Sequence, residues 1–77
     1  MKAFEVIKFG SNLLKEKKIS SYILDSEILL SKILKKSREE ILVNLDQNIK
    51  EKNISAFKNY LQRRSRNEPI AYILKEK

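Results

Sequence analysis

The chain has 77 residues, enough for one small domain that buries only about 60% of the surface its unfolded form exposes. It contains no cysteine and no histidine, which excludes disulfides, thiolate metal sites and the commonest general base near neutral pH. The net charge of +7 permits attraction to nucleic acid or to an acidic protein surface, but the 13 Lys, 10 Ile and 6 Asn also fit codon bias in an AT-rich genome.

The pattern of apolar residues predicts an all-α fold. The chain has only one Gly and one Pro, the residues that commonly form the turns between strands, so strands and hairpins are not expected. We expect a single domain over residues 1–77, built as a small bundle of four to five short helices around a central apolar helix. No apolar run approaches the ~20 residues of a membrane span, and Glu5 and Lys8 interrupt the N-terminal apolar residues, unlike a secretory signal. We therefore expect a cytoplasmic protein that does not enter a membrane.

The first predicted helix covers residues 3–17. Gly10 lies in the middle of its apolar face, where a glycine costs roughly 1 kcal/mol relative to alanine, so we expect a neighbouring helix to approach closely there. Phe4 and Phe9 lie outside this face, and Phe4 either covers an edge of the core or is exposed for another contact. The apolar face consists of Ala3, Val6, Ile7, Gly10, Leu13 and Leu14.

The second predicted helix, residues 22–35, follows Ser20 and Ser21, either of which is suited to an N-cap. It is apolar over more than half its circumference, which is typical of a helix at the centre of a bundle. Its apolar residues are Ile23, Leu24, Ile28, Leu29, Leu30, Ile33 and Leu34.

A capping box formed by Ser37 and Glu40 predicts a short third helix that ends near residue 44. Its inward-facing residues are expected to be Ile41, Leu42 and Leu45. Asn48 is then predicted to cap the fourth helix, with Glu51 as its partner.

The fourth predicted helix covers residues 49–65 and has a core stripe of Ile54, Phe57 and Leu61. Asn67 is suited to the left-handed conformation that ends a helix. Pro69 is suited to the first position of a final apolar turn.

The end of the fourth helix carries the best surface candidates. The arginine cluster (Arg63, Arg64 and Arg66) either complements the helix dipole or contacts an acidic partner or a neighbouring domain. The candidate partner-contact residues are Arg63, Arg64, Arg66, Glu68 and Tyr72. We expect no catalytic, cofactor-binding or metal-binding residue in this chain. The neighbouring carboxylates are spaced by one or two residues and point to different sides of a helix, and a single glycine cannot build a phosphate-binding loop.

Four segments together resemble a known family. They are Leu-Asp-Ser-Glu-Ile-Leu-Leu at residues 24–30, Ser-Arg-Glu at 37–39, Arg-Arg at 63–64 and Glu-Pro-Ile-Ala-Tyr at 68–72. In this order and spacing they resemble the N-terminal domain of the protein-(glutamine-N5) methyltransferases that modify peptide-chain release factors, the HemK/PrmC family. That family has Ala at the third position of the first segment. Asn67 stands where the family usually has Gly, and Lys75 where Gly often follows the last Leu.

The resemblance implies a helical domain that precedes a catalytic domain absent from this chain. The full enzyme would transfer a methyl group from S-adenosylmethionine to the glutamine of the Gly-Gly-Gln loop in a release factor. The N-terminal domain would help to bind and orient the release factor. The family's cofactor site and substrate-amide motif lie in the C-terminal domain. No catalytic residue can therefore be transferred to this chain, which alone should have no activity.

Two alternatives remain. A small basic nucleic-acid-binding module would need an exposed recognition helix, and the dispersion of the lysines over all helices argues against it. A self-association module could use Phe4, Phe9 or the last apolar turn. Salt-dependent duplex binding would favour the first alternative, and a mass that depends on concentration would favour the second.

Overall fold

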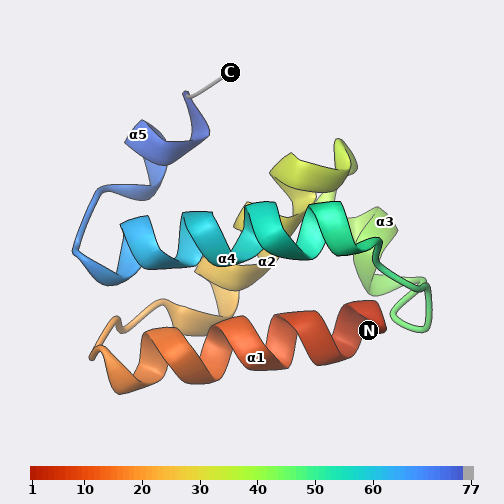
Figure 1. Ribbon diagram of the computed structural model, residues 1–77, viewed down its shortest axis with the longest axis horizontal. Coiled ribbons are helices and arrows are strands. Elements are labelled where there is room, and N and C mark those ends of the chain that lie inside the picture. Colours follow the sequence, from red (N-terminus) through yellow and green to blue (C-terminus); the bar gives the residue numbers. More distant parts are fainter. Residues whose placement is uncertain (76–77) are drawn as a thin grey trace.

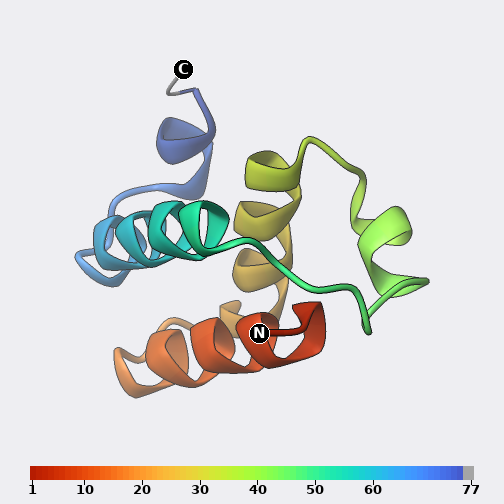
Figure 2. The ribbon, with the colours of Figure 1, turned by 45° about the vertical axis from the view of Figure 1, so that its right-hand side comes forward.

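The computed structural model describes residues 1–75, which form an all-α bundle (Figure 1). Helices α1 and α4 run in roughly the same direction, and α2 crosses them (Figure 2). Helix α2 contacts each of the other four helices, which confirms its predicted central place. The helices are α1 (Ala3–Glu16), α2 (Tyr22–Leu34), α3 (Arg38–Leu42), α4 (Glu51–Ser65) and α5 (Ile70–Leu74).

The core lies where α1 and α4 pack on α2, and Gly10 is at its tightest point. A Cβ atom built on Gly10 would lie 2.7 Å from Cζ of Phe57 and 2.8 Å from Oγ of Ser26. Both neighbours are fully buried, so the predicted close approach at Gly10 is confirmed. The largest fully buried side chains are Phe57, Leu14, Leu29, Leu30, Ile41, Leu61, Ile73, Val6 and Ser26.

The N-terminus is tied to the connection between α3 and α4. The backbone N–H groups of Ala3 and Phe4 donate to the carbonyls of Gln47 (2.9 Å) and Leu45 (3.1 Å), which satisfies donors that the first turn of α1 leaves unpaired. Asn48 pairs with Lys2 in an isolated antiparallel bridge.

This tie explains why the predicted cap at Asn48 is wrong. The N–H of Ile49 donates to the Met1 carbonyl at 2.8 Å, so the chain stays extended past Asn48. Helix α4 consequently begins at Glu51, after Lys50 in the N-cap position. Pro69 likewise lies one residue before the first helical residue of α5, rather than at it, with φ of −59°.

The helix ends follow local rules. The predicted capping box is present, since Ser37 Oγ accepts from the Glu40 N–H (3.1 Å) and the Glu40 carboxylate accepts from the Ser37 N–H (3.0 Å). Helices α1, α2 and α4 all end at a left-handed residue, namely Lys18, Lys35 and Asn67. In each case the next N–H donates to the carbonyl five residues back, as in a Schellman motif. The prediction for Asn67 is confirmed.

Leu42, which was predicted to face inward, is exposed, and so are two of the apolar residues of α2, Ile23 and Leu24. Ile23 is 53% exposed, and Leu24 and Leu42 are each 42% exposed. The neighbouring helices cover the face of α2 that carries Ser26, Leu29 and Leu30, and no described element covers Ile23 or Leu24. Apolar character around most of α2 therefore predicted more burial than the small bundle provides.

Candidate functional site at the end of helix α4

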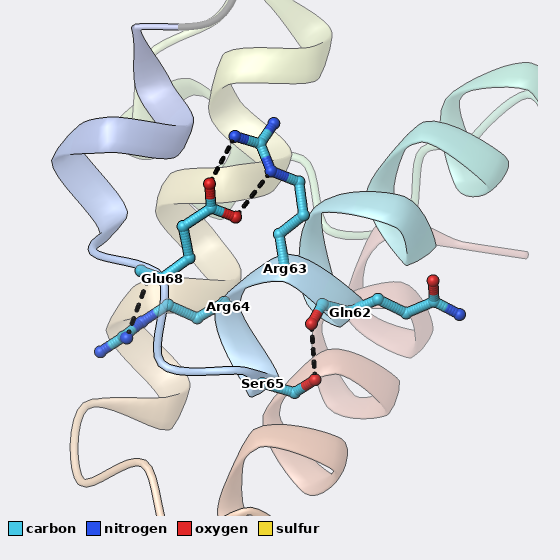
Figure 3. Close-up of polar contacts among 5 residues, drawn as sticks. All are labelled: Gln62, Arg63, Arg64, Ser65 and Glu68. Atoms are coloured by element: carbon cyan, nitrogen blue, oxygen red, sulfur yellow. Dashed lines mark hydrogen bonds and ion pairs between the residues drawn. The ribbon is translucent and has the colours of Figure 1, made fainter.

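Arg63 closes the turn between α4 and α5. Its Nε and Nη2 atoms each donate to one carboxylate oxygen of Glu68, both at 2.8 Å (Figure 3). Such a two-point ion pair fixes both side chains. Asn67 provides the left-handed residue that brings Glu68 back toward Arg63, and the Glu68 N–H also donates to the Arg63 carbonyl at 3.3 Å.

Arg64 connects the end of α4 to the start of α2. Its Nε donates to Oδ2 of Asp25 at 2.9 Å, and its Nη1 donates to the Glu68 carbonyl at 3.2 Å. The Ser21 hydroxyl donates to the same Asp25 oxygen at 2.9 Å. The Asp25 side chain is only 5% exposed, so these hydrogen bonds replace the contacts with water that burial removes. We call Asp25, Arg63, Arg64 and Glu68 the α4-end network.

The other two candidate residues lie outside this network. Arg66 is exposed at the C-cap position of α4. Tyr72 is 64% exposed because Ile73, its neighbour in α5, is fully buried and fixes the orientation of that short helix. The structure thus brings together Arg63, Arg64 and Glu68, and it directs Arg66 and Tyr72 to solvent. A role in partner contact stays a prediction for all five.

The hydrogen bonds from Arg63 hold the pKa of the Glu68 carboxyl below its ordinary value of 4.5. Burial has the next largest effect and raises the pKa, and the positive charges of Arg63 and Arg66 each lower it by a smaller amount. Glu68 is therefore a stable anion at neutral pH and an acceptor within the turn.

A further ion pair was not predicted from the sequence. Arg38 of α3 donates to Oε1 of Glu27 in α2 through Nη2 at 2.9 Å and through Nε at 3.2 Å. The pairing of Asp25 with Arg64 was likewise not predicted from the sequence. One sequence feature could have indicated this pair: Asp25 is an acidic residue within the most apolar helix. Such a residue requires a charged or hydrogen-bonding partner once it is buried.

These ion pairs join the segments that carry the family resemblance. Glu27–Arg38 connects the segment at residues 24–30 to Ser37–Glu39, and Asp25–Arg64 connects it to the end of α4. Arg63–Glu68 connects the end of α4 to the segment at residues 68–72. The charged residues of these segments therefore hold the helices in place.

Residues 1–75 contain neither a candidate metal site nor a candidate membrane-spanning helix. No group of three or more acidic side chains is placed to hold a metal ion. None of the five described helices combines the length and the apolar character needed to cross a membrane.

Comparison with known proteins gives a consistent result. Residues 5–74 match the family model described as the PrmC N-terminal domain. The chain is 42% identical over 65 residues to a release factor glutamine methyltransferase of Clostridium botulinum, covering 84% of this chain and 23% of that protein. The corresponding enzyme of Leptospira interrogans is 36% identical over 72 residues, covering 94% and 25%.

A third relative is a bifunctional methyltransferase of Rickettsia felis, 41% identical over 70 residues, which are 91% of this chain and 13% of that protein. The chain thus spans a quarter or less of the length of these three relatives. No solved structure gives a significant match.

Proposed function

Because this chain belongs to the family of PrmC N-terminal domains, we propose that it is the non-catalytic recognition part of a release factor glutamine methyltransferase. The observation that carries the proposal is the match over residues 5–74, which includes every helix except the first two residues of α1. The name of two relatives supplies the substrate class, a release factor.

The chemistry of the reaction would belong to another part of the protein. In the family that the chain resembles, a catalytic domain follows, with S-adenosylmethionine as the methyl donor and the glutamine of a Gly-Gly-Gln loop as the acceptor. The helical domain would hold the release factor so that this glutamine stays in the catalytic site. Holding a substrate through contacts remote from the reacting atoms is an established way to accelerate its reaction. A cytoplasmic location is part of the same proposal.

A direct titration tests the proposal. The 77-residue chain is titrated with a purified release factor at low and at moderate salt, and with duplex DNA as a control. The proposal predicts saturable binding to the release factor and none to the duplex. Binding that is confined to DNA and weakens steeply with salt would overturn it in favour of a nucleic-acid-binding module.

A further inference from the structure

An open apolar groove lies between α1, α2 and the α3 region. Its volume is about 330 Å³. The first turns of α1 form one wall, and the α3 segment stands beside α2 above the start of α1 (Figure 2). The lining residues are Phe4, Ile7, Lys8, Ser11, Asn12, Tyr22, Ile23, Glu27, Leu42 and Leu45.

The groove brings together apolar side chains from three distant parts of the chain. Phe4, Ile23 and Leu42 form its exposed sides, at 45%, 53% and 42% exposure. Leu45 is half-buried and packs against the core behind them. A monomeric protein rarely leaves large apolar residues from separate elements clustered at one depression unless something covers them.

The dimensions fit a helix. The α1 wall runs from Phe4 to Asn12, which corresponds to about 12 Å of helix rise. Two to three turns of a bound helix could place an apolar stripe along that length, with side chains spaced by three and four residues.

The charges around the groove indicate which charges a bound helix would carry on its polar face. Lys8 is exposed in the lining, and the Lys15 ammonium lies 5.7 Å from the ring centroid of Tyr22, another lining residue. Glu27, the one acidic side chain in the described lining, is neutralised by Arg38 at 2.9 Å. An apolar groove with a basic rim is complementary to an apolar stripe flanked by acidic residues.

We propose that this groove binds an amphipathic helical segment of a partner protein, with an apolar stripe on Phe4, Ile23 and Leu42 and acidic residues facing Lys8 and Lys15. The inference deepens the proposed function and rests on it only for the identity of the partner. A second copy of the chain is the weaker candidate, because a net charge of +7 opposes its approach.

The probe is a fluorescent amphipathic peptide of about 16 residues, with leucines at helical spacing and glutamates on the other face. Its affinity for the 77-residue chain is measured by anisotropy. A second peptide carries lysines in place of the glutamates. The inference predicts saturable binding of the acidic peptide and binding of the lysine peptide weaker by about tenfold or more.

A matched pair of variants locates the binding. Phe4 and Phe9 lie on the same helix with similar exposure (45% and 40%), but only Phe4 lines the groove. Phe4→Ala should weaken binding by about tenfold or more, and Phe9→Ala by less than about twofold. Ile23→Glu, which adds a charge at an exposed position, should also weaken it by about tenfold or more. Circular dichroism checks that each variant remains folded.

Three outcomes overturn the inference: no binding of the acidic peptide, equal loss in both phenylalanine variants, or a dimer that Phe4→Ala dissociates without any peptide binding. Parallel titration with a release factor separates the two proposals. If the peptide binds but the release factor does not, the proposed function is contradicted and the groove is still supported as a binding site. If the release factor binds equally well to the wild type, Phe4→Ala and Ile23→Glu, the groove has no role in that binding and the proposed function is still supported.

Discussion

Arg64 and Arg66 lie two residues apart in sequence but have different surroundings. The Arg64 guanidinium is bonded to a carboxylate that is 5% exposed, whereas Arg66 is exposed. Removing one partner of a buried ion pair leaves the other charge desolvated, which costs about 3–5 kcal/mol. Arg64→Met should therefore lower the free energy of unfolding by about 3 kcal/mol, and Arg66→Met should change it by less than about 0.5 kcal/mol. Urea denaturation of the two variants checks this, and equal effects would contradict the assignment of Arg64 to the fold.

Ser26 is a buried hydroxyl between α1 and α2, at 0% exposure, with no hydrogen-bond partner among the described residues. An unsatisfied buried polar group costs about 1–3 kcal/mol. Ser26→Ala should raise the free energy of unfolding by about 1 kcal/mol or more. Ser31→Ala, in the same helix, is the matched control because the Ser31 hydroxyl donates to the Ile28 carbonyl at 3.2 Å. If both variants shift the thermal midpoint equally, helix propensity alone explains the gain.

At the scale of single elements, the left-handed helix ends are the clearest opportunity for stabilisation. Lys35 has φ of 56°, a conformation that costs a residue with a side chain about 1–2 kcal/mol and costs glycine little. After the entropy that glycine adds to the unfolded chain, Lys35→Gly should stabilise the protein by about 0.5–1 kcal/mol. Lys36→Gly changes the adjacent residue, which has no left-handed φ, and should destabilise it. Stabilisation by both variants would show that loss of charge, not φ, is responsible.

The turn between α4 and α5 should respond to acid. Because the folded-state pKa of Glu68 is lowered, the Arg63–Glu68 pair contributes its full stability above pH 4.5 and loses it as the pH falls through the lower folded-state pKa. Glu68→Gln should therefore be less stable than the wild type at neutral pH, and the difference should shrink on acidification. Glu40, whose pKa the Ser37 hydrogen bonds also lower, titrates in both proteins and cancels in the comparison. A difference that does not vary with pH would contradict the ion-pair account.

Local patterns predicted the elements well, and tertiary contacts decided the rest. The Ser37–Glu40 capping box and the end of α4 at Asn67 depend on a few neighbouring residues, so the sequence was sufficient for both. The start of α4 depends on a pairing of residues 1–4 with residues 45–49, which no local pattern reveals. For the same reason Asn48 was wrongly predicted as a cap.

The candidate site was harder to predict than the fold. Arg63, Arg64 and Glu68 were singled out as candidate partner-contact residues, which stays a prediction. Their contacts within the fold were not predicted, because the partner of Arg64 lies 39 residues away in α2. The apolar groove was not predicted, because Ile23 and Leu42 have the spacing of core residues and only the packing shows that they are uncovered. Phe4, for which both burial and exposure had been considered, is an exposed wall of that groove.

At the scale of the whole molecule, holding the fold together and recognising a partner are tasks of different residues in our proposal. The ion pairs Glu27–Arg38, Arg63–Glu68 and Asp25–Arg64 connect the helices to one another, and we propose that the exposed groove recognises the partner. An isotope-labelled 77-residue chain titrated with an unlabelled release factor, and followed by the NMR shift of each backbone amide, tests this division. The account predicts saturable shift changes concentrated around Phe4, Lys8 and Ile23, with Asp25 and Arg64 little changed. Amides that do not shift at a molar excess of release factor would contradict the central claim that this domain recognises it.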